Sequence, residues 1–408
     1  MSVLRARRSI LVAALLGLSM TAAGCGFGGS GDTAGGLKAG PSQSADRGAS
    51  QDAVQPTAVV TTNVARGATN VPVDHRVQVK ADHGTLASVA VSSRSGSVPG
   101  TMAPDKTSWT AGALLEPGTS YTVVSSVTDE NGTSQTRTTH FRTESLSLDQ
   151  QTYPSIAPLP DQTVGIGMPV IVKFDVPVTN RASIEKNLHV VSKPAQKGSW
   201  HWISNNEVRW RPVHYWKAGT AVTVNADING VPAGNGIYGQ MDRSTTFHIG
   251  DSHIYKVNIQ TDQLRVFDNG HLTRTIPVTT GMPGFTTRSG TKVIIEKDRF
   301  HTMNSETIGI DPNSANGYNI KDVEYAMRLT YSGEFLHAAP WSVASQGHSN
   351  VSHGCTGMST ANAGWLYDHS QIGDVVQYTG SNVHMTLDNG YGDWNEPYAT
   401  YAQGSALH

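Results

Sequence analysis

The chain has 408 residues, of which 15% are charged, and its formal net charge is −2. This near-neutral balance excludes proteins that bind nucleic acid through a basic face, so we expect no nucleic-acid partner. Glycine (42) and proline (19) are abundant, and short runs of Thr, Val and Ser recur between them. These are the materials of turn-rich β structure, so the composition predicts a mainly β protein long enough for several domains.

The N-terminus has the pattern of a secretory signal peptide over residues 1–24. Arg5, Arg7 and Arg8 form a basic head, the apolar run "ILVAALLGLSM" follows, and small residues precede Cys25. The stretch "TAAGC" resembles a bacterial lipobox, in which the cysteine becomes the lipid-carrying first residue of the mature protein. The alternative is an ordinary secretory signal with an incidental cysteine.

Residues 25–52 are predicted to be the lipidated Cys25 followed by a flexible tether. The stretch after Cys25 consists mostly of Gly, Ser, Ala and Asp, so it has almost nothing to bury. We therefore expect a protein anchored by lipid to the outer face of the cytoplasmic membrane. Cys355, the second of two cysteines, then has no disulfide partner; a Cys25–Cys355 bridge is the alternative, at the cost of tying the leader to the far end of the chain.

Residues 53–147 and 148–250 contain an internal repeat. "WTAGALLEPGTSYTV" begins at Trp109 and "WRPVHYWKAGTAVTV" at Trp210, with a Gly-Thr pair at the same offset in each. Short alternating strands separated by turn residues predict two immunoglobulin-like β-sandwiches. The tryptophans are expected to pack in the cores or to lie on an exposed face, and the domains are expected to act as spacers or docking modules.

Residues 251–379 are predicted to form a third, mostly β domain with one short helix. Asp268-Asn269-Gly270 indicates a hairpin, residues 293–295 indicate a buried strand, and Ser359 or Thr360 is the expected cap of a helix that carries Trp365 and Leu366. That helix start is expected to lower the pKa of the nearby Cys355 thiol. The aromatic-rich residues 380–408 are predicted to be an extension packed on this domain.

The stretch "NVSHGCTGMS", residues 350–359, places Cys355 in a polar turn with His353 and Gly354 beside it. A cysteine nucleophile needs a base and backbone N–H groups aimed at the developing oxyanion. His337, at the end of the probable strand "GEFLH", is the candidate base, and Gly354 allows the tight turn that presents the amides. A zinc site made of His337, His348, His353 and Cys355 is the alternative, although this spacing matches no zinc signature.

His337, fourteen intervening residues and then Ser352-His353-Gly354-Cys355 resemble the signature of the L,D-transpeptidases, the YkuD family of peptidoglycan cross-linking enzymes. The resemblance covers roughly residues 53 to 400 and is strongest from 200 onward. It is carried further by "VPAGNGIYGQ", "NSANGYNI", "YSGEFLHAAPWSVASQGHSN" and "GYGDWNEPY". Members of this kind are actinobacterial lipoproteins with two immunoglobulin-like domains before the catalytic domain.

The resemblance implies a catalytic role for Cys355 as nucleophile and for His337 as base, with His353 and Gly354 framing the oxyanion site. Because Ala338 stands where relatives often carry serine, the contact that orients His337 is expected from a backbone carbonyl. The substrate pocket is expected to be lined by Tyr318, Trp341, Met303 and Ser332. Thr356 and Gly357 replace the aliphatic residue and the Asn or Arg that many members carry after the cysteine.

The implied reaction is attack on a peptidoglycan stem tetrapeptide, release of its terminal D-alanine and acyl transfer to an amine of a neighbouring stem. The resemblance also implies inhibition by carbapenems, no cofactor and no metal, and we expect a monomer. Two alternatives stay open: an L,D-carboxypeptidase that hydrolyses the same bond, and a non-catalytic lipoprotein that binds the cell wall.

Overall fold

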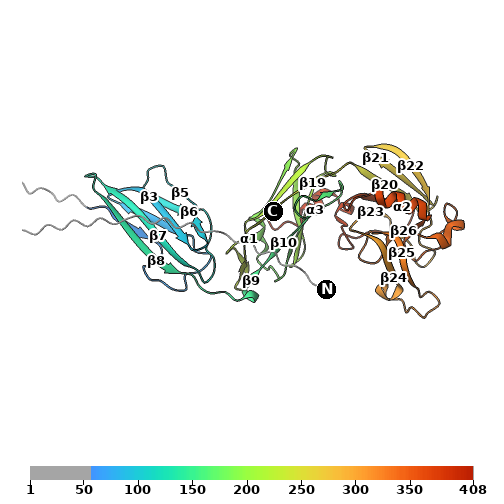
Figure 1. Ribbon diagram of the computed structural model, residues 1–408, viewed down its shortest axis with the longest axis horizontal. Helices are drawn as coiled ribbons and strands as arrows, with labels where there is room; N and C mark the ends of the chain where they lie inside the picture. The colour runs from blue at the N-terminus through green and yellow to red at the C-terminus, as the bar shows by residue number, and fades with distance from the viewer. Residues whose placement is uncertain (1–56, 408) are drawn as a thin grey trace, which may run out of the picture. The chain divides into compact units, whose positions relative to one another are not determined.

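The computed structural model describes residues 57–407 (Figure 1). The predicted signal peptide, Cys25 and the tether lie outside the described residues. None of the helices in residues 57–407 is long and apolar enough to cross a membrane.

The first part of the described chain is a sandwich of two four-stranded sheets. Alternating side chains of its strands point inward, as in "SYTVVSSVTD", where Tyr121, Val123 and Val127 are buried between more exposed neighbours. Trp109 packs with them in one core shared by both sheets, which is one of the two placements expected for the tryptophans. The sheets have the orders β1 (Val59–Thr62), β2 (Gln78–Asp82), β6 (Ser108–Ala111), β5 (Gly100–Met102) and β4 (Gly96–Val98), β3 (Gly84–Ser93), β7 (Ser120–Asp129), β8 (Ser134–Arg142).

The second part is again a sandwich, with Trp210 in its core. The internal repeat is structural: Gly118 (φ 59°) and Gly219 (φ 75°) both form left-handed turns just before a central strand. The two sheets have the orders β10 (Pro154–Ala157), β12 (Val170–Phe174), β15 (Glu207–Pro212), β14 (Gly198–Ser204) and β11 (Thr163–Val164), β19 (Arg243–Ile249), β16 (Ala221–Ala226), β13 (Leu188–Lys193). Smaller elements complete it: η1 (Leu148–Gln150), β9 (Gln151–Thr152), α1 (Arg181–Glu185), β17 (Pro232–Gly234) and β18 (Ile237–Gly239).

The third part is built from two sheets and one substantial helix. The five-stranded sheet has the order β22 (His271–Pro277), β21 (Gln263–Asp268), β20 (His253–Asn258), β28 (Val375–Thr379), β23 (Gly290–Val293). The four-stranded sheet has the order β24 (Glu296–Asn304), β25 (Asn319–Arg328), β26 (Phe335–Ala338), β27 (Thr356–Met358). Helix α2 (Thr360–His369) packs against β25 and β26, and short 3-10 turns η2 (Ser305–Ile308) and η3 (Pro340–Ser345) flank the region around Cys355.

Several local predictions for this domain are confirmed. Asn269 (φ 48°) and Gly270 (φ 86°) form the two-residue turn between β21 and β22, and the Ser359 side chain caps α2 by accepting from the N–H of Asn362. The strand expected at 293–295 lies earlier in the chain than predicted, at Gly290–Val293. Strand β23 ends at Val293, and Ile294 is buried without continuing the ladder.

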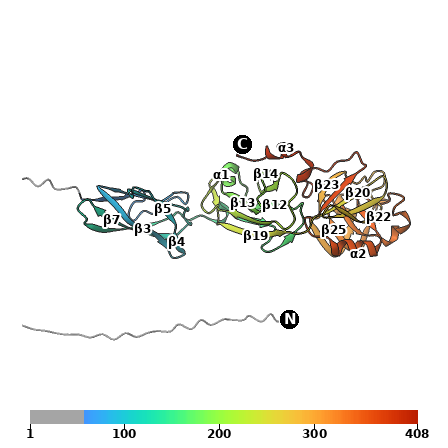
Figure 2. The ribbon, with the colours of Figure 1, turned by 90° about the horizontal axis from the view of Figure 1, so that it is seen from above.

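The last residues contact the second sandwich as well as the third domain. Asp393, in η4 (Asp393–Asn395), binds Arg209 of β15 with 3.1 Å between Oδ2 and the guanidinium nitrogen. Trp394 donates from Nε1 to the carbonyl oxygen of Gly167. Helix α3 (Tyr398–Ala402) lies against β14 (Figure 2), while Asn395 bonds the backbone of Thr291 in β23. The extension therefore joins two domains of the chain.

Candidate active site

The side chains of His337 and Cys355 project into one pocket because β26, which carries His337, is the parallel neighbour of β27, which Cys355 directly precedes. His337 of β26 pairs with Gly357 of β27, and Cys355 lies two residues before Gly357. Side chains two residues apart along an extended chain point to the same face. Both residues line a cavity of about 190 Å³.

Most of the residues singled out from the sequence line this cavity. Met303, Tyr318, Trp341 and His353 surround Cys355 and His337 there. Three further residues complete the wall: Ile320, Val351 and Ser352. Ile320 and Val351 were missed, since an isolated aliphatic residue in a strand or loop carries no signal of a binding role.

Ser332 lies elsewhere than predicted. It lines a neighbouring cavity of about 520 Å³ together with Phe285, Arg288 and Glu334, and Asn389 donates to its hydroxyl oxygen across 2.9 Å. The cause is the tight turn between β25 and β26, which carries Ser332 away from the face that His337 occupies. His353 lines both cavities and so forms part of the wall between them.

His337 is oriented by its own strand. Its Nδ1 lies 2.7 Å from the carbonyl oxygen of Ala338; since a carbonyl oxygen only accepts, Nδ1 carries the proton and Nε2 has a free lone pair. This is the backbone contact that the sequence predicts. Burial lowers the pKa of His337 to about 4, and the Ala338 hydrogen bond opposes that shift only in part. Near neutral pH the ring is therefore an uncharged base.

Cys355 is the free cysteine of the described chain, and only 9% of it is exposed. Its thiol donates to the carbonyl oxygen of Gly333 across 3.4 Å. Burial raises the pKa of this thiol to about 12. The predicted lowering of the pKa by the helix start is therefore wrong, because strand β27 separates Cys355 from the first turn of α2.

The loop before Cys355 is held by its own hydrogen bonds. Gly354 has φ 118°, a conformation that L side chains rarely adopt. The Ser352 hydroxyl donates to the carbonyl oxygen of Cys355 (2.6 Å) and accepts from the N–H of Gly354 (3.1 Å). The hydroxyl of Thr287 donates to the carbonyl oxygen of Gly354 (2.8 Å). These contacts fix the backbone on both sides of the thiol.

The zinc ligand set considered from the sequence is not brought together. His348 is exposed and does not line the cavity that holds His337, His353 and Cys355. The ring of His353 instead packs between Phe285 and Tyr318, with centroids 4.5 and 5.0 Å away, and burial lowers the pKa of His353.

A different trio offers metal-ligand geometry within residues 57–407. One ligand atom each of His253, Asp268 and His369 lies within 4.8 Å of the others. Each imidazole already binds a carboxylate: His253 Nδ1 is 3.0 Å from Asp374 and His369 Nε2 is 2.8 Å from Asp268. None of these residues lines the cavity around Cys355.

The residues after the cysteine are fixed by packing. Thr356 is fully buried, and its hydroxyl lies 2.7 Å from the hydroxyl of Tyr378. A Cβ placed on Gly357 would lie 2.8 Å from Cβ of Ala339 and 3.2 Å from Cγ2 of Thr279. In this chain the position therefore has no room for the longer side chain that many members of the resembled family carry.

Two sandwiches precede a mostly β domain that brings Cys355 and a backbone-oriented His337 into one pocket, and this arrangement places the protein among the L,D-transpeptidases. The L,D-transpeptidase catalytic domain matches residues 252–377, and a bacterial Ig domain matches residues 68–232. L,D-transpeptidase 2 of Mycobacterium tuberculosis is 37% identical over 85% of this chain and 85% of its own length. The chain belongs to the L,D-transpeptidase family.

Two further similarities accompany that match. L,D-transpeptidase 5 of Mycobacterium tuberculosis is 33% identical over 81% of this chain and 73% of its own length. The solved structure of the LD transpeptidase LdtMt1 in complex with imipenem is 36% identical, covers 55% of this chain and 97% of that chain, and has a TM-score of 0.49.

Proposed function

We propose that this protein cross-links peptidoglycan by L,D-transpeptidation, with Cys355 as nucleophile and His337 as base. The observation that carries the proposal is the shared pocket of the two residues, in which the free lone pair of His337 Nε2 follows from the Nδ1 contact to Ala338. The fixed backbone at Gly354 and the apolar side chains that line the cavity support the same function, since acyl transfer needs an oriented, water-poor site.

In the first half of the reaction, Cys355 Sγ attacks the carbonyl carbon between the third stem residue and the terminal D-alanine. The thiol proton passes to Nε2 of His337, and the new oxyanion is stabilised by backbone N–H groups. Because the Gly354 N–H already binds Ser352, the Cys355 amide is the oxyanion donor that we expect to act. The C–N bond then breaks, and D-alanine leaves with the proton from His337.

In the second half, an amine of a neighbouring stem attacks the thioester. His337 takes a proton from this amine, the C–S bond breaks, and the Cys355 sulfur regains its proton. The product is a cross-link between third-position residues. No cofactor is needed, since the thiol and the imidazole account for every proton and electron pair in the cycle.

The site supports acylation by a stem tetrapeptide, and the identity of the deacylating nucleophile separates a transpeptidase from a carboxypeptidase. The test is to incubate the purified protein with disaccharide-tetrapeptide and to analyse the products by mass spectrometry. We expect a dimer that has lost one D-alanine. A product that is only the disaccharide-tripeptide would assign carboxypeptidase activity instead.

Cys355→Ala is the matched control. It should keep the fold, because it replaces one small, buried side chain by another, and it should form no acyl-enzyme. Release of D-alanine by Cys355→Ala at the parent's rate would refute the assignment of the nucleophile. Absence of any product from the parent protein would favour a non-catalytic role in wall binding.

The family acts on the cell wall, and the predicted signal and anchor would place this member outside the cytoplasmic membrane. In this proposal the partners are the stem peptides and, through Cys25, the membrane lipid. The two sandwiches would carry the catalytic domain away from the membrane.

A further inference from the structure

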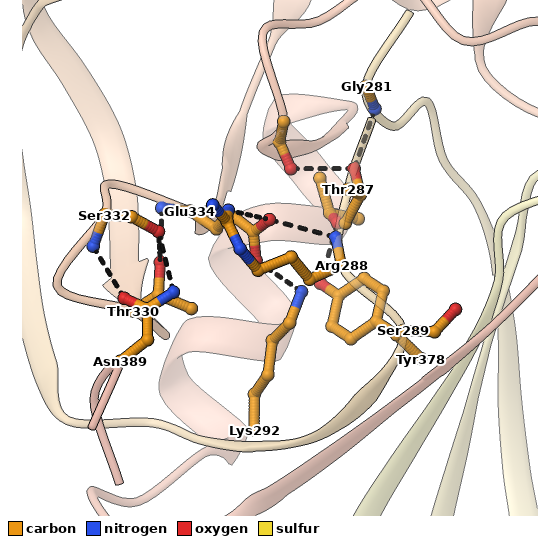
Figure 3. Close-up of polar contacts among 12 residues, drawn as sticks. Gly281, Thr287, Arg288, Ser289, Lys292, Thr330, Ser332, Glu334, Tyr378 and Asn389 are labelled. Carbon is orange, nitrogen blue, oxygen red and sulfur yellow. Dashed lines mark hydrogen bonds and ion pairs between the residues drawn. The ribbon is translucent and has the colours of Figure 1, made fainter. Parts of the chain in front are cut away.

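A buried ion pair lies next to the backbone that surrounds Cys355. Lys292 of β23 is fully buried, and its Nζ lies 2.5 Å from Oε2 of Glu334, which is only 4% exposed (Figure 3). Neither atom has a hydrogen-bond partner in the described chain beyond this contact. Lysine and glutamate are almost never buried to this degree unless they are paired, and burial lowers the pKa of Lys292.

Glu334 touches the segments on both sides of the thiol. It directly follows Gly333, whose carbonyl oxygen accepts the thiol hydrogen of Cys355. A Cβ placed on Gly354 would lie 3.7 Å from Cγ of Glu334, so the carboxylate side chain packs against the residue before the nucleophile. The other carboxylate oxygen of Glu334 accepts from the backbone N–H and the guanidinium of Arg288, at 3.0 and 3.2 Å.

The turn that carries Glu334 is held by two further hydrogen bonds. The Glu334 N–H donates to the hydroxyl of Thr330 (2.9 Å), and the Ser332 N–H donates to the side-chain oxygen of Asn389 (2.9 Å) (Figure 3). The chain then enters β26, which carries His337. The segment from Gly333 to β26 therefore contains both the carbonyl group that accepts the Cys355 thiol hydrogen and the strand that carries His337.

Lys292 reaches the other side of the nucleophile. Its Nζ lies 3.7 Å from the centroid of the Tyr378 ring, a cation–π contact between two buried side chains. The Tyr378 hydroxyl lies 2.7 Å from the hydroxyl of Thr356, the residue directly after Cys355. Thr287, in the same segment as Lys292, donates to the carbonyl oxygen of Gly354. Residues 287–292 thus contact the backbone before Cys355 directly and the Thr356 side chain after it through Tyr378.

We propose that Lys292 and Glu334 are positioning residues for the nucleophile: their ion pair fixes the Gly333 turn, Gly354 and the Tyr378–Thr356 contact in one geometry, and so aligns the Cys355 thiol with His337. The inference rests on the proposed function. Neither residue touches substrate in this assignment, and both act through the backbone and the contacts named above.

Stability alone is a poor explanation of the pair. Two charges lose their hydration on burial, and well-packed apolar residues of similar volume often stabilise a core as well or better. The pair also changes the electrostatics at the thiol, because Glu334 raises the pKa of Cys355 and Lys292 lowers it. The charged or titratable groups around Cys355 are Lys292, Arg328, Glu334, Tyr318, Tyr378, His301, His337 and His353.

The experiment compares Lys292→Met, Glu334→Gln and the double variant Lys292→Met/Glu334→Leu, all in a Cys25→Ser background. The double variant removes both fully buried charges and leaves only the partly exposed Arg288 without its carboxylate partner, so it remains informative where a single variant fails to fold. Two rates are measured. Alkylation of Cys355 by iodoacetamide at pH 9 reports the thiolate fraction, whereas acylation by imipenem reports the alignment of thiol, base and oxyanion donors.

We expect the alkylation rate and the acylation rate to respond differently to the substitutions. Glu334→Gln alkylates faster than the parent, because a negative charge near the thiol is lost, yet it is acylated at least about tenfold more slowly. Lys292→Met is slower in both reactions. The double variant is slowed at least about tenfold in acylation while its alkylation stays within about twofold of the parent. A double variant that is acylated as fast as the parent would overturn the proposal.

Asp374→Asn is the matched control for a buried carboxylate of the same domain. Asp374 is fully buried and binds His253 and Tyr255, neither of which lines the cavity around Cys355. It should lower the unfolding temperature and leave the acylation rate within about twofold of the parent. An equal loss of acylation in Asp374→Asn would reduce the effect of the ion pair to general destabilisation and overturn the proposal.

Different results would refute the proposed function and the positioning role of Lys292 and Glu334. A parent protein that neither reacts with imipenem nor releases D-alanine would refute the proposed function. Alkylation of Cys355 does not depend on that outcome, so it would still test whether the ion pair acts on the thiol. Equal alkylation rates in Lys292→Met and Glu334→Gln would refute the action of the pair on Cys355.

Discussion

Cys355 donates its thiol hydrogen bond to the carbonyl oxygen of Gly333, with 3.4 Å between Sγ and O. Burial raises the pKa of this thiol to about 12 and lowers the pKa of His337 to about 4. Both groups are therefore neutral near pH 7, and Cys355 rests as a thiol. In the proposed mechanism the thiolate forms only as substrate is attacked, when His337 Nε2 takes the proton.

The first prediction concerns the free thiol. In a Cys25→Ser background, alkylation by iodoacetamide should be slow at pH 7 and should keep rising with pH through 10, because only the thiolate reacts and the pKa of Cys355 is raised to about 12. Mass spectrometry of the time course gives the rate, and Cys355→Ala serves as the unreactive control. A rate that levels off below pH 8 would contradict the neutral resting state.

Removing the base should affect substrate-like acylation far more than this alkylation. His337→Ala should slow acylation by imipenem by roughly a hundredfold or more, the usual contribution of a positioned base. His348→Ala is the control, since His348 is exposed and outside the cavity. Stopped-flow absorbance of the β-lactam follows both reactions. Equal rates for His337→Ala and the parent would remove His337 from the mechanism.

His337 should also make the folded state sensitive to acid. Its folded pKa is lowered to about 4 from an ordinary value of 6.5, so the unfolded chain binds a proton more readily than the folded protein does. The free energy of unfolding should therefore fall as pH drops from about 6.5 to about 4, by roughly 3 kcal/mol for this group. Urea titrations at several pH values measure this, and His337→Gln should lose that part of the pH dependence.

The sequence predicted the parts of this site that depend on local chemistry. Turn residues located the β21–β22 hairpin, and the Cys355 motif together with a strand-end His337 located the pocket, because residue type and spacing determine such features directly. It did not predict Ile320, Val351 or the Lys292–Glu334 pair. Those positions depend on which strands become neighbours, and Lys292 and Glu334 are forty-two residues apart in the chain. The predicted direction of the shift in the Cys355 pKa was also wrong, because the burial that raises this pKa is a property of the folded domain.

Cys25 lies outside the described residues, and its lipidation remains a prediction from the signal sequence. Cys25→Ser should move the protein from the membrane to the soluble fraction while leaving its activity on soluble muropeptides unchanged, because the anchor takes no part in the chemistry. Stable anchoring needs more than one acyl chain, and a bacterial lipoprotein cysteine carries several. Fractionation and N-terminal mass spectrometry are the measurements; a mature soluble protein that begins away from Cys25 would contradict the prediction.

Gly357 offers a test of the packing behind the nucleophile. A Cβ at this position would lie 2.8 Å from Cβ of Ala339, closer than two carbon atoms can approach without movement, so β27 and the segment after β26 would have to separate. Gly357→Ala should cost roughly 1–3 kcal/mol of stability, the range for overpacking a core, and should slow acylation because His337 lies on β26 and Cys355 directly precedes β27. Gly357→Ala/Ala339→Gly should recover much of both losses, since it removes the methyl group that clashes. Calorimetry and the imipenem reaction measure the two effects. If the double variant is as unstable as the sum of the single variants, the close contact between these two positions is not the reason that residue 357 is glycine.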